Sequence, residues 1–203
     1  MKINKEKVLE VLKLDVTLVA ATKYLDTKLT NELIDLGVTD IGENRVQALL
    51  EKVDDLHPVK VHFIGHLQKN KVKQVINKID CLESLDSIKL VDLIEKYRKS
   101  PLDCFIEVNL GEEQKSGIKL DLLDNFINYC RKCAKINLLG LMGMAHDTND
   151  LAVIEEDFKL IEDLNKKYNF KYLSIGMSND YLIALKHGAT HIRLGRILLE
   201  EEE

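Results

Sequence analysis

The feature that most constrains the fold is a regular alternation of short apolar runs with segments of helical periodicity. Eight apolar runs, each ending in a polar or glycine-containing turn, lie at residues 17–22, 38–42, 61–65, 80–84, 104–109, 138–145, 172–175 and 191–194. Between them, apolar residues recur at helical spacing, as at Leu29, Leu33 and Leu36 ahead of Gly37. Strands that alternate with helices are typical of parallel β-α crossovers.

Eight such units predict an α/β fold, a single (β/α)8 barrel of the TIM type. The chain has 203 residues, which suits one domain over residues 1–203, with an amphipathic N-terminal helix at about residues 3–14. The acidic run at residues 200–203 is interpreted as a solvated helix end. An open, doubly wound sheet is the alternative that the same alternation leaves open.

The charge balance argues against two classes of partner. The net charge is −5 and the 31% of charged residues are mixed in sign, whereas nucleic acids and acidic membranes need a basic patch. The longest near-apolar run, residues 136–145, is about half as long as a membrane span requires. Four cysteines without a secretory signal predict a reducing, cytoplasmic location. We therefore expect a cytoplasmic monomer without nucleic-acid or membrane partners.

The first apolar run stops abruptly on Lys23. Residues 18–22 are small or branched, as in a strand buried on both faces. A lysine at the end of such a strand is expected to be partly removed from water, which favours the neutral, nucleophilic amine. This chemistry suits a lysine that forms a Schiff base. The alternative is a strand-end lysine whose ammonium reaches the surface.

In a barrel, the carboxyl ends of the strands share one face, and active sites lie there. The last two strand ends carry Gly176, Ser178 and Gly195. Glycines allow backbone amides to approach an anion, and Ser178 is predicted to open a helix with free N–H groups. These residues favour a phosphate site, while a plain N-cap and a plain turn are the alternative.

Other pairs of potential ligands are interpreted as structural. Cys130 and Cys133 have the spacing of a redox or zinc pair, but they lie within a helical stripe with no second pair nearby in the sequence. His62 and His66 have no carboxylate beside them in the sequence and are expected to pack or to line the barrel. We therefore expect no metal site.

A series of short motifs is spread over residues 17–198, namely Ala20-Ala21-Thr22-Lys23, Ile41 to Val46, His62 to Lys71, Val108-Asn109 followed by Lys115 to Ile118, Gly140-Leu141-Met142, Ser174 to Ser178 and Arg193-Leu194-Gly195. In their residues and in their order, these motifs resemble those of the YggS/PROSC family of pyridoxal phosphate homeostasis proteins. The resemblance implies a fold-type III barrel similar to the N-terminal domain of alanine racemase, without a C-terminal β-domain. It also implies that pyridoxal 5′-phosphate (PLP) is the cofactor.

The resemblance implies a role for each matching residue. Lys23 matches the lysine that forms a Schiff base with PLP, Arg193 matches the arginine that faces the pyridine nitrogen, and Asn44 lies on the loop that borders the ring. The expected phosphate contacts are the Ser178 side chain and the backbone amides of Gly195 and Arg196.

Two positions depart from the family pattern, and one further lysine is a candidate. Leu25 stands where many members have a second lysine, and Arg196 stands where many have threonine, so a hydroxyl contact to phosphate is lost there. Lys115 follows the fifth predicted strand, on the same face as Lys23, and is a candidate second amine for exchange during PLP release. Pairing of Lys115 with Glu112 or Glu113 is the alternative.

The resemblance implies a protein that holds and buffers PLP, a carrier of vitamin B6 with apo PLP-dependent enzymes as candidate acceptors, and no enzyme. An arginine opposite the pyridine nitrogen keeps it unprotonated, which weakens the ring as an electron sink. A second base is also expected to be missing after the eighth strand. The alternatives are an amino-acid racemase or decarboxylase-like PLP enzyme, and a phosphate-sugar enzyme with a Schiff-base lysine.

Overall fold

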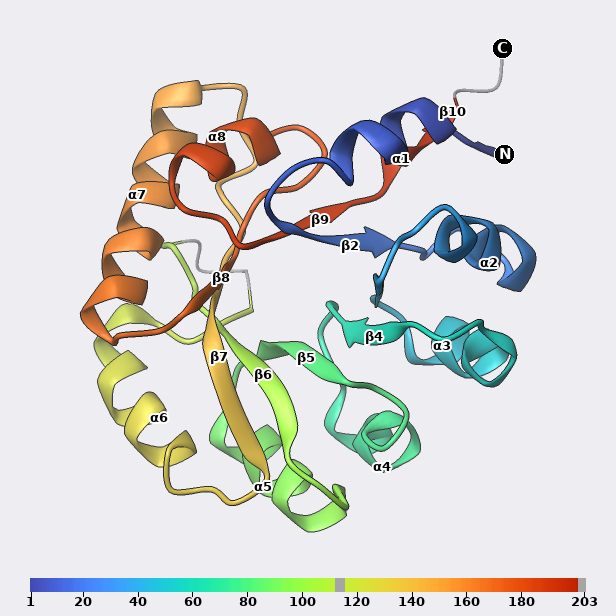
Figure 1. The fold of residues 1–203 in the computed structure, drawn as a ribbon. Helices are drawn as coiled ribbons and strands as arrows, with labels where there is room; N and C mark the ends of the chain where they lie inside the picture. The colour runs from blue at the N-terminus through green and yellow to red at the C-terminus, as the bar shows by residue number, and fades with distance from the viewer. Residues whose placement is uncertain (112–115, 201–203) are drawn as a thin grey trace.

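The computed structural model describes residues 1–111 and 116–200. Eight parallel strands close into a barrel in chain order (Figure 1). They are β2 Thr17–Ala21, β3 Asp40–Glu43, β4 Lys60–Phe63, β5 Cys81–Leu85, β6 Leu102–Glu107, β7 Ile136–Met142, β8 Tyr172–Ser174 and β9 His191–Leu194. The first and last of these pair in parallel, with Val19 opposite Arg193. The predicted (β/α)8 barrel is therefore confirmed, and the open sheet is wrong.

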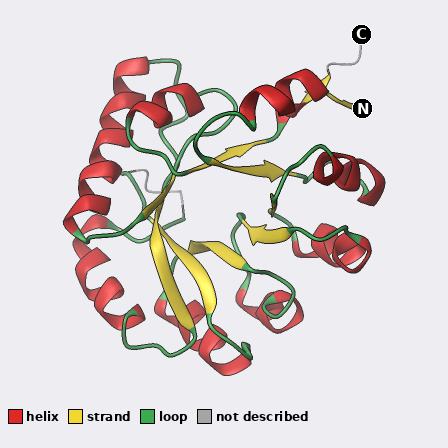
Figure 2. Ribbon diagram, in the orientation of Figure 1, coloured by secondary structure: helices red, strands yellow, loops and turns green. Residues whose placement is uncertain are grey.

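The helices surround the barrel on its outer side (Figure 2). The α-helices are α1 Lys5–Val11, α2 Thr27–Asp35, α3 Val46–Lys52, α4 Val72–Val75, α5 Ile88–Tyr97, α6 Leu123–Cys130, α7 Leu151–Lys167 and α8 Tyr181–Lys186. Short 3-10 turns are η1 Val53–Asp55, η2 Lys69–Lys71, η3 Leu120–Leu122 and η4 Arg196–Leu198. A side-chain cap explains where α2 begins. Asp26 directly precedes this helix, and its Oδ1 accepts from the backbone amide of Leu29 at 2.8 Å.

The two ends of the described chain differ from the prediction. Lys2–Ile3 forms strand β1, which pairs antiparallel with β10, Leu199–Glu200, so the N-terminal helix is shorter than residues 3–14 (Figure 1). Asn4 explains the change, because its side chain caps α1 while its amide donates to the carbonyl of Leu198 at 2.9 Å. Glu200 therefore lies in a strand rather than at a helix end, and residues 201–203 of the acidic run lie outside the described residues.

The core is aliphatic and lies between the barrel and the helices. The inner faces of the helices supply buried residues such as Leu33, Leu49 and Ile94, while the strands supply Ile41 and Ile106. Burial of this apolar surface is the main source of stability. In the part of the chain that the structure describes, no helix is both long and apolar enough to cross a membrane.

The cysteines are part of this packing. Cys81, Cys104 and Cys130 are buried, and all four thiols are free. Burial raises the pKa of the Cys130 thiol to about 12 and also raises the pKa of Cys133. Protonated thiols are poor metal ligands and poor nucleophiles. These properties agree with the structural role expected for the pair at the end of α6.

Candidate functional site

A cavity of about 560 Å³ lies at the carboxyl ends of the barrel strands. It is lined by all six residues that the sequence predicted to hold a cofactor, namely Lys23, Asn44, Ser178, Arg193, Gly195 and Arg196. These residues come from the beginning and the end of the chain. Closure of the barrel between β2 and β9 brings them together.

Lys23 lies at the wall of this cavity but is open to solvent. Strand β2 ends at Ala21, and Thr22 is buried, whereas the side chain of Lys23 is exposed, with its Nζ 4.8 Å from the centroid of the Tyr24 ring. The chain turns immediately, since the amide of Leu25 donates to the carbonyl of Thr22 at 3.0 Å. The expectation that Lys23 is partly removed from water is therefore wrong, because the strand stops before reaching it.

Lys52 supports the turn that carries Lys23. It is the last residue of α3 and is only 4% exposed. Its Nζ donates to the carbonyl oxygens of Thr22 and Leu25 at 2.8 and 3.1 Å and forms an ion pair with the buried Glu43. A lysine in the last turn of a helix is usually predicted to keep its ammonium in solvent. The sequence therefore gave no sign that Lys52 is buried under the turn that carries Lys23.

Leu25, where the family pattern has a lysine, packs into the hydrophobic core and is 7% exposed. The side chain at this position therefore lies away from solvent in this chain. An apolar residue fits that environment, which gives the departure from the family pattern a physical reason.

The loops after β8 and β9 meet on one side of the cavity. The amide of Gly195 donates to Oγ of Ser178 at 3.4 Å. The prediction that Ser178 opens a helix is wrong, because α8 begins at Tyr181. Asp180 closes the preceding turn by accepting from the amide of Met177 at 2.5 Å. The hydrogen bond from the Met177 amide to the Asp180 side chain stabilises a turn at residues 177–180, so these residues do not join the helix.

Arg196 and the two glycines of these loops have distinct environments. The Arg196 side chain is exposed, and its Nη2 lies 3.5 Å from Oδ1 of Asn179. Gly176 has φ +95°, and a Cβ there would lie 2.7 Å from Cβ of Ala184. Gly176 is thus required by its own turn and by packing against α8. Gly195 has no such restriction, since its φ is −133°.

Arg193 projects from β9 toward the inside of the barrel and is 6% exposed. Its Nη1 donates to the carbonyl oxygen and to Oγ of Ser174 at 2.8 and 2.6 Å, and its Nη2 donates to the carbonyl of Gly143 at 2.9 Å. Burial lowers the pKa of the guanidinium, and the carboxylates of Glu83, Asp180 and Glu107 oppose this shift. A guanidinium remains charged in proteins, so Arg193 is a fixed donor at the cavity.

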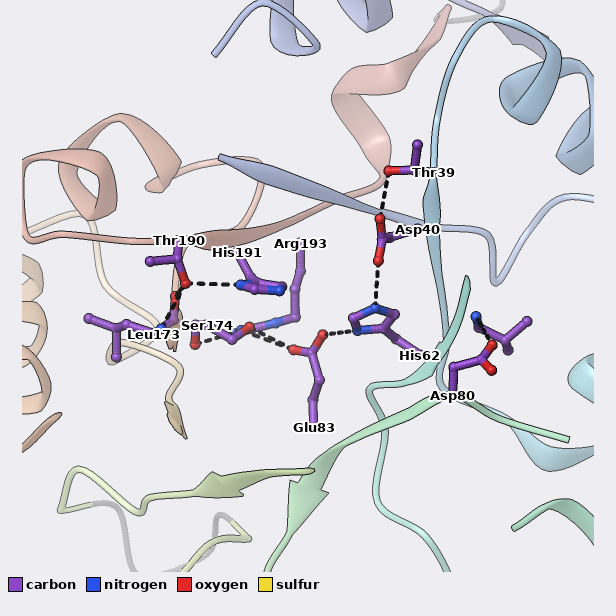
Figure 3. Close-up of polar contacts among 11 residues, drawn as sticks. Thr39, Asp40, His62, Asp80, Glu83, Leu173, Ser174, Thr190, His191 and Arg193 are labelled. Atoms are coloured by element: carbon purple, nitrogen blue, oxygen red, sulfur yellow. Dashed lines mark hydrogen bonds and ion pairs between the residues drawn. The ribbon is translucent and has the colours of Figure 1, made fainter. Parts of the chain in front are cut away.

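Behind Arg193, polar side chains run across the barrel interior (Figure 3). We call these residues the interior polar chain: Asp40, His62, Glu83, Ser174 and Arg193. Nδ1 of His62 lies 2.7 Å from Oε1 of Glu83, and its Nε2 lies 3.0 Å from Oδ1 of Asp40. Neighbouring strands supply both carboxylates, which is why the sequence around His62 did not reveal them.

Further polar residues at the cavity were not singled out by the sequence. Glu107 ends β6 and is 3% exposed; burial raises its pKa, although Ser116 Oγ donates to its Oε1 at 2.6 Å. Nδ1 of His146 lies 2.7 Å from Oδ2 of Asp157, a buried residue of α7. His66, unlike these residues, was named from the sequence as a packing or lining residue, and it lines the cavity. The sequence signal that could have identified Glu107 and His146 is a polar residue at or just after the carboxyl end of a predicted strand.

Two expectations concern metal ions and Lys115. Within residues 1–111 and 116–200, no group of three side chains is arranged to hold a metal ion. Lys115, the candidate second amine, lies outside the described residues.

Comparison with known proteins gives a consistent family. Residues 2–201 match the family model of the alanine racemase N-terminal domain. The chain is 34% identical over 198 residues to the pyridoxal phosphate homeostasis protein of Aquifex aeolicus, covering 92% of this chain and 87% of the relative. It is 33% identical to the human protein of the same name, covering 92% of this chain and 76% of the relative.

The fold is shared with a solved structure of PipY from Synechococcus elongatus with PLP bound. The TM-score is 0.90 at 24% identity, and the match covers 97% of this chain and 99% of that chain. From these matches and the motifs around its cavity, this chain belongs to the pyridoxal phosphate homeostasis (YggS/PROSC) family, whose barrel is that of the alanine racemase N-terminal domain.

Proposed function

We propose that this protein binds PLP as a Schiff base on Lys23 and buffers the cofactor, without catalysing a reaction of its own. The observation that carries the proposal is the gathering of an amine, a fixed guanidinium and a phosphate-type loop pair around one cavity of about 560 Å³. The name of the Aquifex aeolicus relative supports it, as does the PLP bound in PipY.

The residues of the cavity fit the chemical groups of PLP. The hydroxyl of Ser178 and the amides of Gly195 and Arg196 would hold the phosphate, and the two loops already meet at 3.4 Å. The side chain of Asn44 lies at the cavity wall, and the Oδ1 atom of its side-chain amide has no hydrogen-bond partner in the described structure. A ligand would give this amide a partner. When bound, PLP supplies an aldehyde carbon to which the amine of Lys23 adds reversibly.

Arg193 supports binding rather than catalysis. Its guanidinium only donates hydrogen bonds, so the pyridine nitrogen facing it must stay unprotonated to accept one. An unprotonated pyridine is a weak electron sink, which disfavours the carbanion chemistry of PLP enzymes. Arg193 cannot turn away, because Ser174 and Gly143 hold it from two sides.

The remaining expectations are part of the same proposal. We propose one PLP-binding domain over residues 1–203, a monomeric state and a cytoplasmic location, with apo PLP-dependent enzymes as acceptors. The four free cysteines support a reducing compartment.

The test is to locate the covalent bond. Purified protein with PLP should be yellow, and borohydride reduction should fix a pyridoxyl mass on Lys23 in peptide mass spectrometry. Lys23→Ala should lose the label. Lys28→Ala is the matched control, because Lys28 is a nearby exposed lysine on α2, and it should keep the label. A label on Lys28 or Lys115, or no label, contradicts the proposal.

A further inference from the structure

We propose that Glu83 and His62 are positioning residues that hold Arg193 in the orientation in which it meets the pyridine nitrogen of PLP. This inference rests on the proposed function and adds to it a set of buried groups that do not touch the cofactor. Neither Glu83 nor His62 lines the cavity, whereas Arg193 does. Any effect of these two residues on a ligand therefore passes through Arg193.

The first step of the argument is the state of His62. Each ring nitrogen faces a carboxylate oxygen, Glu83 on one side at 2.7 Å and Asp40 on the other at 3.0 Å. A neutral imidazole would direct one lone pair at a carboxylate, so both nitrogens must donate and the ring is an imidazolium. Thr39 holds the far end of the chain by donating to Oδ2 of Asp40 at 2.6 Å.

The second step is the link from Glu83 to Arg193. Ser174 Oγ donates to Oε2 of Glu83 at 2.6 Å and accepts from Nη1 of Arg193 at 2.6 Å (Figure 3). Nη1 also lies 3.7 Å from the same Glu83 oxygen. Donation thus runs in one direction, from Arg193 through Ser174 to Glu83, which fixes the plane of the guanidinium.

The third step is the charge balance. The interior polar chain carries alternating charges, negative on Asp40 and Glu83 and positive on His62 and Arg193. Burial alone would raise the pKa of Glu83, but hydrogen bonding to His62 and the charges of His62 and Arg193 lower it to about 2. The ring of His191, 6.2 Å from His62, stays neutral because burial lowers its pKa to about 4. The four charges cancel, so Arg193 is a cation with a built-in counterion.

The fourth step is to account for the donors of Arg193. A guanidinium has five N–H groups. Both hydrogens of Nη1 go to Ser174, and one of Nη2 goes to Gly143. Among the described residues, no acceptor takes the Nε hydrogen or the second Nη2 hydrogen. These two groups remain for a ligand in the cavity that Arg193 lines.

Buried ions of this kind are poor evidence for stability alone, because well-packed apolar residues often stabilise a core as well or better. Orientation is different, since an apolar residue in place of Glu83 would leave the Nη1 side of Arg193 without its counterion. The interior polar chain therefore holds the guanidinium of Arg193 in one orientation.

The experiment compares two ligands by titration, PLP and its 1-deaza analogue, in which a C–H replaces the pyridine nitrogen. Wild-type protein should prefer PLP by roughly 10- to 100-fold, the range expected for one hydrogen bond to a charged group. Glu83→Gln and His62→Gln should reduce this preference to a few-fold. Ser174→Ala should do the same, and as a smaller change it decides the question if Glu83→Gln does not fold.

Two controls separate orientation from general damage. Ser178→Ala should weaken both ligands equally, because both carry the phosphate. Glu43→Gln alters an equally buried carboxylate outside the interior polar chain and should keep the preference, whatever it does to the melting temperature.

The outcomes are distinct. If wild-type protein binds neither ligand, the proposed function fails, and the inference fails with it. If wild-type protein binds both ligands equally, PLP binding stands, but Arg193 does not meet the ring nitrogen and the inference is overturned. If the preference survives in Glu83→Gln, His62→Gln and Ser174→Ala, these residues are structural only.

Discussion

The Nζ of Lys52 donates to the carbonyl oxygen of Thr22 at 2.8 Å, directly before the proposed cofactor lysine. A buried cation from the end of α3 thus holds the backbone on which Lys23 stands. The same Nζ reaches the carbonyl of Leu25, so the bonds enclose the turn that contains Lys23. The position of the amine therefore depends on a residue that has no place in the cavity.

Lys52→Met should lower the free energy of unfolding by roughly 3–5 kcal/mol, the usual cost of leaving a buried charge without its partner. The partner is Glu43, which is fully buried. Urea denaturation of the protein without ligand measures this directly. Adding Glu43→Gln to Lys52→Met should restore part of the loss, because it removes the uncompensated charge.

The matched control is Lys5→Met. Lys5 pairs with Glu32 at 3.1 Å, but 62% of its side chain is exposed. Such a pair contributes at most about 1 kcal/mol. Equal losses for Lys5→Met and Lys52→Met would contradict the support role of Lys52.

Ser178→Ala should weaken PLP binding by roughly 1–3 kcal/mol, since a hydrogen bond to a doubly charged phosphate is lost. Pyridoxal, which lacks the phosphate, should bind the variant and the wild type equally well. Titration of both ligands against both proteins gives the comparison. A loss of the same size for pyridoxal would place Ser178 elsewhere than at the phosphate.

Gly65→Ala should destabilise the protein and displace Asn44. A Cβ at residue 65 would lie 2.4 Å from the carbonyl oxygen of Asn44, which is a backbone atom that cannot rotate away. Gly195→Ala is the control, because its Cβ would lie 3.4 Å from Cβ of Ala21, an ordinary contact, and its amide is kept. Thermal melts should show a loss of stability for Gly65→Ala only, and a PLP titration of Gly65→Ala should show the weaker binding that follows from the displacement of Asn44.

The stability of the fold should decrease as the pH rises above neutrality. Burial opposes the charge on His62, but hydrogen bonds with Asp40, Cys81 and Glu83 raise its pKa well above 6.5. The protonated His62 therefore contributes its full stabilisation of the fold below about pH 6.5, the pKa of an unfolded histidine. That contribution is lost as the pH rises through the higher pKa that His62 has in the folded protein.

Glu83 has the opposite dependence, since its pKa is lowered from 4.5 to about 2. Its contribution to stability is present above pH 4.5 and is lost as the pH falls toward 2.

The dependence on His62 is measured by urea unfolding between about pH 7 and 10. The unfolding midpoint of the wild type should decrease over this range, and the midpoint of His62→Gln should change less. Parallel curves for the two proteins would refute this prediction.

Racemase turnover with alanine or other common amino acids should be absent or marginal. The reason is Arg193, which is held as a donor and leaves the pyridine nitrogen unprotonated. Loss of optical rotation or formation of the D-amino acid measures it. A rate of about 1 per second or more would be that of an ordinary enzyme and would favour the racemase alternative.

The sequence by itself determined the barrel and the face of the site. Apolar runs and helical stripes depend on local periodicity, so all eight strands were predictable with errors at their ends. Because parallel strands place their carboxyl ends on one face, the neighbourhood of Lys23, Ser178 and Gly195 followed from order along the chain.

The tertiary structure alone decided the partners of each polar side chain. The carboxylates on His62 come from β3 and β5, and the support of Lys23 comes from the end of α3. Local periodicity states which residues face inward, but lateral contacts depend on strand register and on closure, which involve residues far apart in the sequence. The exposure of Lys23 was missed for the same reason, since β2 ends where its pairing with β3 and β9 ends.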